Sequence, residues 1–558
     1  MKQLIECVPN FSEGNDMELI KKITDEIESV DGVKLLDVDP GKATNRTVVT
    51  FVGEPEPVID AAFLAIKKAK ELIDMTKHHG EHPRMGATDV CPLVPIANIT
   101  MDELVKYAHK LGKRVGEELD FPVYFYEFAA TEEKRRNLAN VRKGEYEGLS
   151  KKLEDPNWKP DFGPVKFVPR TGATAISARN FLVAYNFNLN TTSTRRANAI
   201  AFDVREAGRI KKVNGKKVLD KNGNPERIPG TLKATKAIGW YIEEYGIAQI
   251  SMNLTDITIT SIHKAFEEVD KSARARGVRV TGSELVGLVP KQALIDAAKH
   301  FLKKQQRSLG IDEKEMIKIA VKSLGLDDLK PFVPEERIIE YLLEDNSDKP
   351  LVNMTLSDFA DETASESPAP GGGSISAYMG AMGVALATMV ANLSSHKRGW
   401  DDKWETYSKI AEQGQALKDQ LINLVDEDTQ AFNKIMNSFS LPKSTEEEIA
   451  ARKKAIQDAT LYATEVPFKV MKVAAQSMAL AKQMAEIGNP NSVTDAGVGA
   501  LAIRSAVMGA FLNVKINAAD LEDKKQVEKI LSEGEKIEQE IQRLEIEVLQ
   551  IVNDKIKF

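Results

Sequence analysis

The chain is poor in cysteine and has no excess of basic charge. Its 558 residues include only Cys7 and Cys91, which cannot build a disulfide framework or a paired CxxC zinc site. Lysine and arginine number 76 against 83 acidic residues, whereas a nucleic-acid-binding surface normally needs a basic excess or a clustered basic face. These two scarcities indicate a protein of the reducing cytoplasm that does not bind nucleic acid.

Export and nucleotide-binding signals are missing as well. The N-terminus reaches Asn10 and Glu13 before any apolar segment attains signal-peptide length, so no export is expected. None of the polar stretches of the first half matches GxGxxG or GxxxxGK[ST], which leaves nucleotide binding without support. The apolar segment 375–393 approaches the length of a bilayer span, but it consists mainly of Ala, Gly and Met. We therefore interpret it as a buried helix and expect no membrane partner.

What the chain contains is enough apolar sequence for several globular domains, since 42% of its residues are hydrophobic and 28% charged. In 1–182 and again in 183–335, short β-branched runs alternate with helical periods, which predicts two α/β or α+β units. Two Asn-Gly pairs within 209–230 predict a hairpin insertion. The proline-containing and charged residues 336–350 are the predicted linker, and 351–558 has helical periodicity almost throughout, which predicts a helical bundle or layer.

Three of the seven histidines, His78, His79 and His82, fall within five positions of the segment 77–89. These residue types are compatible with a metal site, an acid/base centre or a solvated polar loop. A glycine and a proline make the segment a loop, so it lacks the convergence of a helical HExxH site, and we predict no metal. The neighbouring Arg84 can bind a carboxylate as a fork, so an acid/base centre and a polar loop both remain open.

Other polar positions of the first half could contribute to the same site. Asn10 follows the first predicted strand, and Asp39 and Arg46 lie in a loop between two further strands. Gly163 and Gly172 flank another strand, where the backbone could approach a flat ligand closely. Turns and helix N-caps explain several of these positions equally well.

The helical part has its own candidates. Gly371 and Gly372 of the motif SPAPGGGS either form a turn before a helix capped by Ser374 or leave open N–H groups that could face a ligand. Asp428 lies on the apolar side of a predicted helix, four residues after Leu424, where a carboxylate is costly without a task or a partner.

The alternative for Asp428 is an ordinary surface acid. It stands beside Asp426 and Glu427, and we expect two of these three acids to face water. Asn491 and Asp495 of GNPNSVTD are weaker candidates, because that stretch also fits a loop and an N-cap.

Several longer motifs occur together and in order. Those of the first half are CVPNFSEG (7–14), HHGEHPRMGATDVCP (78–92), DFGP (161–164), SARNFLVAYN (177–186) and SMNLTD (251–256). Together they resemble the glutamate formimidoyltransferase family of histidine degradation, over nearly all of the first 330 residues. Those of the second half are SPAPGGGS (367–374), LVDEDTQAF (424–432), LPK (441–443) and GNPNSVTDAGVGA (488–500). They resemble the formimidoyltetrahydrofolate cyclodeaminase family, so the whole chain is similar to the fused, bifunctional family.

This resemblance implies a fold and two reactions. It implies two ferredoxin-like α/β subdomains that form the transferase, followed by an all-helical domain. The transferase would move the formimino group of N-formimidoyl-L-glutamate to N5 of tetrahydrofolate, giving L-glutamate and 5-formimidoyltetrahydrofolate. The helical domain would close this product to 5,10-methenyltetrahydrofolate and release ammonia. Tetrahydrofolate would be a co-substrate, expected to be polyglutamylated, and the protein a homo-oligomer.

The resemblance also assigns residues. His82 matches the family's transferase acid/base, a task that one imidazole with a pKa near neutrality could perform for both amine nitrogens. Asp428 matches the cyclodeaminase carboxylate, and the stretch from Gly163 to Gly172 matches the folate-binding segment. The remaining candidates for binding substrate are Asn10, Asp39, Arg46, Arg84, Gly371, Gly372, Asn491 and Asp495.

Two alternatives stay open for the helical domain. It could be a methenyltetrahydrofolate cyclohydrolase, which has the same fold and much of PAPGGGS, or an assembly module without activity. Ammonia release from 5-formimidoyltetrahydrofolate distinguishes these possibilities.

Overall fold

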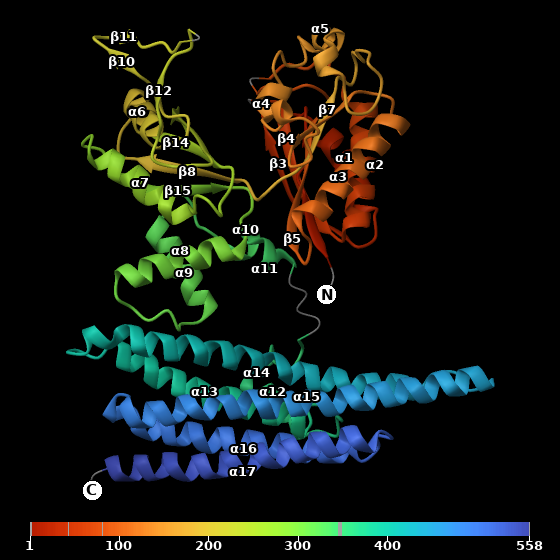
Figure 1. Cartoon of the computed structure of the whole chain (residues 1–558), viewed down its shortest axis with the longest axis vertical. Helices are drawn as coiled ribbons and strands as arrows, with labels where there is room; N and C mark the ends of the chain where they lie inside the picture. Colours follow the sequence, from red (N-terminus) through yellow and green to blue (C-terminus); the bar gives the residue numbers. More distant parts are fainter. Residues whose placement is uncertain (1–2, 43, 81, 222, 344–348, 557–558) are drawn as a thin grey trace. The chain divides into compact units, whose positions relative to one another are not determined.

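The computed structural model describes residues 3–42, 44–80, 82–221, 223–343 and 349–556, which form two compact units (Figure 1). The first unit comprises Met1–Ala297 and Leu324–Leu343, and the second comprises Ala298–Ser323 and Glu344–Phe558. Helix α8 (Lys291–Lys304) runs from one unit into the other, and almost all of α9 (Glu313–Leu324) belongs to the second. The predicted linker 336–350 contains the end of α10 (Pro334–Arg337) and all of α11 (Ile339–Leu343).

The first subdomain is a ferredoxin-like fold with an extension. Its elements in chain order are β1 (Leu4–Cys7), β2 (Asn10–Phe11), α1 (Met17–Glu28), β3 (Val33–Gly41), β4 (Arg46–Gly53), α2 (Pro55–Leu72) and β5 (Thr88–Ala97). Strand β4 pairs antiparallel with β1, β2 and β3, and β5 pairs antiparallel with β1 and β2, as in a split βαβ arrangement. The extension adds α3 (Met101–Glu118), β6 (Val123–Glu127), α4 (Leu138–Val141), α5 (Leu149–Glu154) and β7 (Thr174–Ala178). In it β7 runs parallel to both β5 and β6.

The second subdomain repeats the ferredoxin-like order. Its elements are β8 (Val183–Leu189), α6 (Thr194–Val204), β13 (Thr235–Ile242), β14 (Ile247–Leu254), α7 (Ile262–Arg274) and β15 (Val280–Val286). They form one antiparallel sheet in the order β13-β14-β8-β15. The predicted pair of ferredoxin-like subdomains is confirmed.

The predicted hairpin insertion is confirmed as well, between α6 and β13 (Figure 1). It consists of β9 (Arg209–Ile210), β10 (Lys212–Val213), β11 (Lys216–Lys217) and β12 (Arg227–Ile228). Asn214 and Gly215 join β10 to β11, and both have positive φ, at 51° and 77°. This is the two-residue turn that Asn-Gly favours between antiparallel strands.

Helices α1, α2 and α3 cover one face of the first sheet, and α4 and α5 cover the opposite face only over β6 and β7. In the second sheet, α6 and α7 pack against one face. In β4, Val49 and Phe51 point into the core beneath α1, α2 and α3, whereas Val48 and Thr50 point to the other face. In β13, Thr235 and Ala237 are buried while Lys236, Ile238 and Trp240 are exposed. Each subdomain therefore leaves part of one sheet face open, over β1 and β4 in the first and over β13, β14 and β8 in the second, and these open parts carry polar side chains.

The second unit consists of helices, as predicted. They are α12 (Leu356–Thr363), α13 (Gly372–Ser395), α14 (Trp404–Phe439), α15 (Glu446–Ile487), α16 (Val493–Ala518) and α17 (Lys524–Lys555). The long helices lie side by side, with α14 visible as a teal ribbon and α15, α16 and α17 as blue ribbons in Figure 1. One hydrophobic core runs through the unit.

Small residues bring α13 and α16 into close contact. A Cβ atom added to Gly383 of α13 would lie 2.8 Å from the carbonyl oxygen of Gly499 in α16. By length and composition, residues 372–395 and 490–518 could each cross a membrane, yet 61% and 50% of their apolar windows are buried within the protein. Helix α13, which was expected to be a buried helix, packs against α14, α15 and α16.

Candidate active sites

A cavity of about 530 Å³ lies between the two open sheet faces of the first unit. Alternate residues of its strands supply the lining, because side chains with a period of two share one face. On the first sheet these are Glu6, Asn10, Arg46, Val48, Thr50, Val90 and Pro92, and on the second they are Ala184, Asn253, Lys236 and Val286. Four residues predicted for the site line this cavity, namely His82, Asn10, Asp39 and Arg46.

His82 is the histidine of the cluster that lines the cavity, and it is half-buried there. Its Nδ1 lies 2.7 Å from the carbonyl oxygen of Pro83. A carbonyl oxygen only accepts, so Nδ1 carries the hydrogen and Nε2 is the basic nitrogen of the neutral ring. The loop between α2 and β5 thus presents an oriented proton acceptor.

A buried ion cluster lies beneath this loop. Asp89 is fully buried at the start of β5, and its Oδ2 accepts hydrogen bonds from both Arg46 and Arg142. Its Oδ1 accepts a third from the backbone N–H of Met85, at 2.9 Å. Burial raises the pKa of Asp89, but the two arginines hold it below its ordinary value. Two cations on one carboxylate leave the cluster with a net positive charge.

This cluster and burial set the charge of His82. Burial first, and then the charges of Arg46 and Arg142, lower the pKa of His82 from 6.5 to about 4. The value is below the near-neutral pKa expected for this residue, so the imidazole is neutral in the ligand-free cavity at physiological pH. It is therefore a base that is ready to accept a proton.

Arg46 and Asn10 are already bonded to one another. Asn10 Oδ1 accepts hydrogen bonds from Nε and Nη2 of Arg46, at 3.0 and 2.8 Å, while Nη1 of Arg46 binds Asp89. This guanidinium is thus engaged on both edges. It contributes positive charge and shape to the cavity, but it has no free pair of N–H donors for a substrate carboxylate.

The structure does not bring Arg84 into the cavity. Its guanidinium is buried and donates to both carboxylate oxygens of Glu147, at 3.0 and 2.7 Å. It also donates to Nδ1 of His78, at 3.2 Å, whose Nε2 lies 2.8 Å from the carbonyl oxygen of Asn45. Arg84 and His78 therefore brace the loop that carries His82.

The rest of the histidine cluster shows no metal geometry. His79 is exposed, and its carbonyl oxygen accepts a hydrogen bond from Asn45. Glu81 lies outside the described residues. In the part of the chain that the structure describes, no three His, Cys, Asp or Glu side chains gather as metal ligands would.

Gly163 and Gly172 approach protein backbone rather than the cavity. Both have positive φ, at 81° and 74°. A Cβ atom at Gly163 would lie 2.2 Å from the carbonyl oxygen of Phe121, and one at Gly172 would lie 2.1 Å from that of Met85. Gly172 therefore packs against the loop that follows His82, and neither glycine lines the cavity.

Sequence reasoning missed five charged residues of the cavity, which are Glu6, Asp37, Arg142, Arg179 and Lys236. Arg179 lies in the SARNF motif directly after β7, and Lys236 lies on β13, a strand that was not predicted. Among the described residues, neither Arg179 nor Lys236 forms an ion pair within 4.0 Å. These two cations are therefore available to an anionic ligand.

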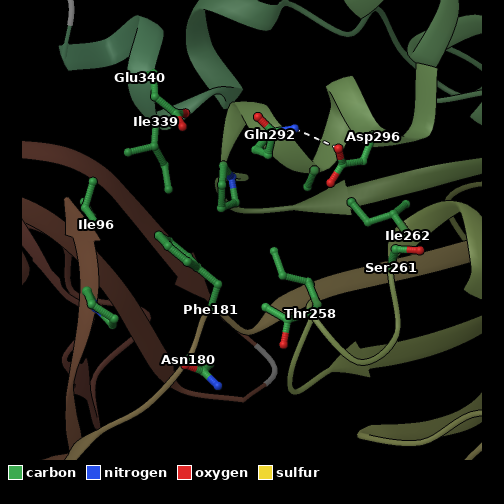
Figure 2. A pocket seen from close by; sticks show the side chains of 14 residues that line it. Ile96, Asn180, Phe181, Thr258, Ser261, Ile262, Gln292, Asp296, Ile339 and Glu340 are labelled. Atoms are coloured by element: carbon green, nitrogen blue, oxygen red, sulfur yellow. Dashed lines mark hydrogen bonds between the residues drawn. The ribbon is translucent and has the colours of Figure 1, made fainter. Parts of the chain in front are cut away.

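Phe181 lines a second cavity of about 390 Å³ (Figure 2). The same residue also lines the first cavity. The polar side chains of the second cavity are paired within the protein. Gln292 donates to Asp296 at 2.7 Å, and Asn180 donates to Asp256 at 2.8 Å. None of the predicted site residues lines it, so we assign it no catalytic part.

The helical unit has its own site where α13 begins against α14. Asp428 of α14 is half-buried and faces Gly373, at which an added Cβ atom would lie 2.1 Å from Oδ1 of the carboxylate. Ser374 Oγ lies 3.3 Å from Asp428 Oδ2, and the backbone N–H of Ser374 also bonds to this carboxylate. Burial raises the pKa of Asp428, and these bonds from Ser374 only partly oppose it.

The open backbone of SPAPGGGS therefore faces a carboxylate of the same chain. Gly371 is the N-cap of α13, and Gly372 packs near Asn513 of α16, with a notional Cβ 3.1 Å from its side chain. The glycines let Asp428 approach the start of the helix, where N–H groups and the helix dipole favour negative charge.

The expectation that two of the three neighbouring acids face water is wrong for Asp426. This residue is only 3% exposed, and it accepts hydrogen bonds from the backbone N–H groups of Leu351 and Val352, at 2.9 and 3.2 Å. The contact joins residues 75 positions apart, so helical periodicity could not reveal it. Glu427 is half-buried and accepts from Tyr462 at 3.2 Å.

The structure does not bring Asn491 and Asp495 to Asp428 within one chain. The backbone of Asn489 donates to Ser394 Oγ at 2.8 Å, at the C-terminal end of α13. Ser374 stands at the opposite end of that helix, and 20 residues of α-helix span about 30 Å. Asn491 and Asp495 therefore lie far from Asp428 within one chain.

Comparisons with known families cover nearly the whole chain. Residues 4–179 match the family described as formiminotransferase domain, N-terminal subdomain, and residues 184–344 match formiminotransferase domain. Residues 355–536 match the family described as formiminotransferase-cyclodeaminase.

Individual relatives agree with this division. The formimidoyltransferase-cyclodeaminase of Gallus gallus is 46% identical over 94% of this chain and 94% of its own length. The glutamate formimidoyltransferase of Streptococcus pyogenes serotype M1 is 43% identical over 54% of this chain and 94% of its own length. The methenyltetrahydrofolate cyclohydrolase of Methylorubrum extorquens is 37% identical over 37% of this chain and 98% of its own length.

The first prediction concerns the charge of His82. In protein labelled at its histidine rings, the NMR signals of His82 are expected to titrate near pH 4, and Arg142→Gln is expected to raise this pKa because it removes a neighbouring positive charge. Replacement of the exposed Lys143 by Gln serves as the matched control and leaves the titration unchanged. A wild-type pKa near 6.5 would contradict the proposed electrostatic origin.

Proposed function

The chain belongs to the formimidoyltransferase-cyclodeaminase family, and on this premise we propose how its two sites perform the two reactions. It is a bifunctional enzyme. Its α/β part transfers the formimino group from N-formimidoyl-L-glutamate to N5 of tetrahydrofolate. Its helical part closes the product to 5,10-methenyltetrahydrofolate and releases ammonia.

The transferase reaction needs one proton to leave N5 and another to reach the departing nitrogen of glutamate. We assign both transfers to Nε2 of His82, whose neutral ring can accept the first proton as the tetrahedral adduct forms. Once protonated, the imidazolium is more acidic than an ordinary histidine, because it is partly buried and lies near Arg46 and Arg142. It then returns the proton to the glutamate nitrogen as the adduct breaks down.

The carboxylates of the substrates need cations that are not already engaged. Arg46 is bound to Asp89 and Asn10, and Arg84 is bound to Glu147 outside the cavity. We therefore assign carboxylate binding to Arg179 and Lys236. The flat pterin ring would lie between the two open sheet faces, above the floor formed by β1, β4 and β5.

The cyclodeaminase reaction needs a base for the N10 proton and an acid for the departing ammonia. Asp428 suits both tasks, because burial raises its pKa and the start of α13 fixes its carboxylate. Gly373 permits this position, since any larger residue would collide with the carboxylate.

One observation carries the proposal for the first site. Of three clustered histidines, only His82 lines the cavity, whereas His78 is bonded to Arg84 and Asn45 and His79 is exposed. A structural loop alone would not need an oriented imidazole with a free basic nitrogen beside two arginines.

The second prediction tests His82. His82→Gln is expected to lower formimino transfer by roughly 10²- to 10⁴-fold, because it removes the general acid/base without changing the cavity size greatly. Conversion of preformed 5-formimidoyltetrahydrofolate by the helical site is expected to continue at the wild-type rate. His79→Gln, in the exposed neighbour, is the control. Full transfer by the His82 variant would show that the site is assigned wrongly.

The third prediction tests Asp428. Asp428→Asn is expected to reduce ammonia release from 5-formimidoyltetrahydrofolate by at least roughly 10²-fold while formimino transfer continues, because the amide cannot shuttle a proton. Asp419→Asn changes an exposed acid of the same helix and serves as the control.

Assays with 5,10-methenyltetrahydrofolate accompany this test, because they separate deamination from the cyclohydrolase alternative. Normal ammonia release by the Asp428 variant would refute the assignment of the catalytic carboxylate.

We further propose that the protein is a homo-oligomer whose contacts involve α13 and α16. Each of these neighbouring helices carries an exposed apolar stripe. The residues are Met382, Met389 and Leu393 on α13, and Val498, Leu501 and Leu512 on α16. Stripes of this kind are typical of surfaces that another protein covers.

The fourth prediction tests this assembly. Analytical ultracentrifugation of the wild type is expected to show a species larger than the 61.6 kDa chain. Leu501→Glu is expected to lower its mass, because a charge would replace an apolar contact. Ile546→Glu introduces the same charge at an exposed position of α17 and is the control. A monomeric wild type would overturn the proposal.

The cellular location and the form of the folate are two further proposals. We propose that the protein works in the cytoplasm, in keeping with the two buried free thiols, Cys7 and Cys91, whose sulfur atoms are 3.5 Å apart. Cell fractionation tests this location. We also propose that tetrahydrofolate binds with a polyglutamate tail near the exposed Lys236, which a comparison of KM for mono- and polyglutamates tests.

A further inference from the structure

Glu6 is an unusual residue on the floor of the transferase cavity. It lies on β1, is only 5% exposed and lines the cavity. No hydrogen bond to its carboxyl group occurs among the described residues. Burial raises the pKa of Glu6 from 4.5 to about 7, although the charge of Arg179 opposes the change. A buried carboxyl group without a hydrogen-bond partner is costly, so it calls for a ligand that supplies donors.

The other acids of the cavity are in a different position. Asp39 is exposed to solvent, so water can satisfy its carboxylate. Asp37 is half-buried and is influenced by the charge of Arg337. Glu6 is therefore the cavity acid whose need for a bound donor is greatest.

The position of Glu6 relative to the proton acceptor limits what it can bind. Glu6 pairs with Val52 of β4, and Asn10 pairs with Val48 of the same strand. These partners are four positions apart, a distance of about 13 Å along an extended strand. Asn10 is bonded to Arg46, whose charge acts on His82. Glu6 and His82 therefore lie toward opposite ends of the cavity floor.

We propose that Glu6 binds the edge of the pterin ring that carries N3–H and the 2-amino group, and so directs N5 toward His82. This inference rests on the proposed function of the cavity. The pterin edge offers two parallel donors, which match the two oxygens of one carboxylate. N5 belongs to the other ring of the bicycle, so a ring held at Glu6 can reach His82 with its reacting nitrogen.

The formimino group is a second possible partner, but its position argues against it. This amidine also presents N–H donors to a carboxylate. However, its carbon must approach N5 to within about 3 to 3.5 Å for attack, which places it at the His82 end. Glu6 is thus better placed for the far edge of the pterin ring than for the group being transferred.

The fifth prediction pairs a protein change with a ligand change. Transfer is measured with tetrahydrofolate and with its 2-desamino-2-methyl analogue, which lacks the 2-amino donors. The wild type is expected to prefer tetrahydrofolate in kcat/KM by roughly 10- to 100-fold, because the lost hydrogen bonds involve a charged acceptor. In Glu6→Gln the preference is expected to shrink to within about 3-fold, because the amide cannot accept both donors.

Two controls separate this effect from general damage. Asp39→Asn changes an acid of the same cavity and is expected to keep the wild-type preference, whatever it does to the absolute rate. In Glu6→Gln, KM for N-formimidoyl-L-glutamate is expected to stay unchanged while KM for tetrahydrofolate rises. If the Gln variant does not fold, Glu6→Asp keeps a shorter carboxylate and is expected to retain part of the preference with weaker binding.

Two results would overturn the inference. One is a wild-type preference that persists in the Glu6 variant, and the other is an increase in KM for N-formimidoyl-L-glutamate alone. An error in the role proposed for Glu6 can be distinguished from an error in the function proposed for the cavity. If His82→Gln loses transfer while Glu6→Gln keeps the wild-type preference, only the pterin assignment is wrong. If His82→Gln retains transfer, the cavity itself is not the transferase site.

Discussion

The buried carboxylate of Asp89 is the constraint on which the first site depends. It holds Arg46 and Arg142 side by side and also binds the backbone of Met85, two residues after Pro83. Without this anion, two guanidinium groups could not share a half-buried floor, because their mutual repulsion would be uncompensated. With it, the positive charge left over keeps His82 neutral and favours anionic substrates. Asp89 does not line the cavity, yet this one side chain sets both the charge of the cavity and the protonation state of His82.

The architecture around that cluster could largely be predicted, because each strand and helix leaves a local pattern. The β-branched runs and helical periods noted in 1–182 include those of β4 and α2, and the structure contains both elements. Strand β13 was missed, since Gly239 and the exposed Ile238 and Trp240 blur the alternation. The cavity itself was beyond prediction, because it exists only where two open sheet faces meet.

The candidate sites could be predicted in part, and the wrong predictions share one physical origin. The roles of His82 and Asp428 were predicted from motifs that resemble those of a family, but the roles of their neighbours depend on contacts across many residues. Arg84 is bonded to Glu147, 63 positions away, and Asp426 is bonded to Leu351, 75 positions away. Residue type indicates that a side chain can bind an anion or act as an acid. Only the fold decides whether another part of the chain has already engaged it.

The two sites use burial of a carboxyl group in different ways. In Asp428 the rise in pKa is moderated by the N–H and hydroxyl of Ser374, so the carboxylate is fixed in place while it remains able to hold a proton. In Glu6 no hydrogen bond among the described residues opposes the rise in pKa that burial causes. A ligand that donates hydrogen bonds to this carboxyl group would therefore gain binding energy. The difference follows from local geometry, because Gly373 admits the start of a helix to Asp428, whereas Glu6 faces an open cavity. A fixed carboxyl group suits proton transfer, and an unsatisfied one suits recognition.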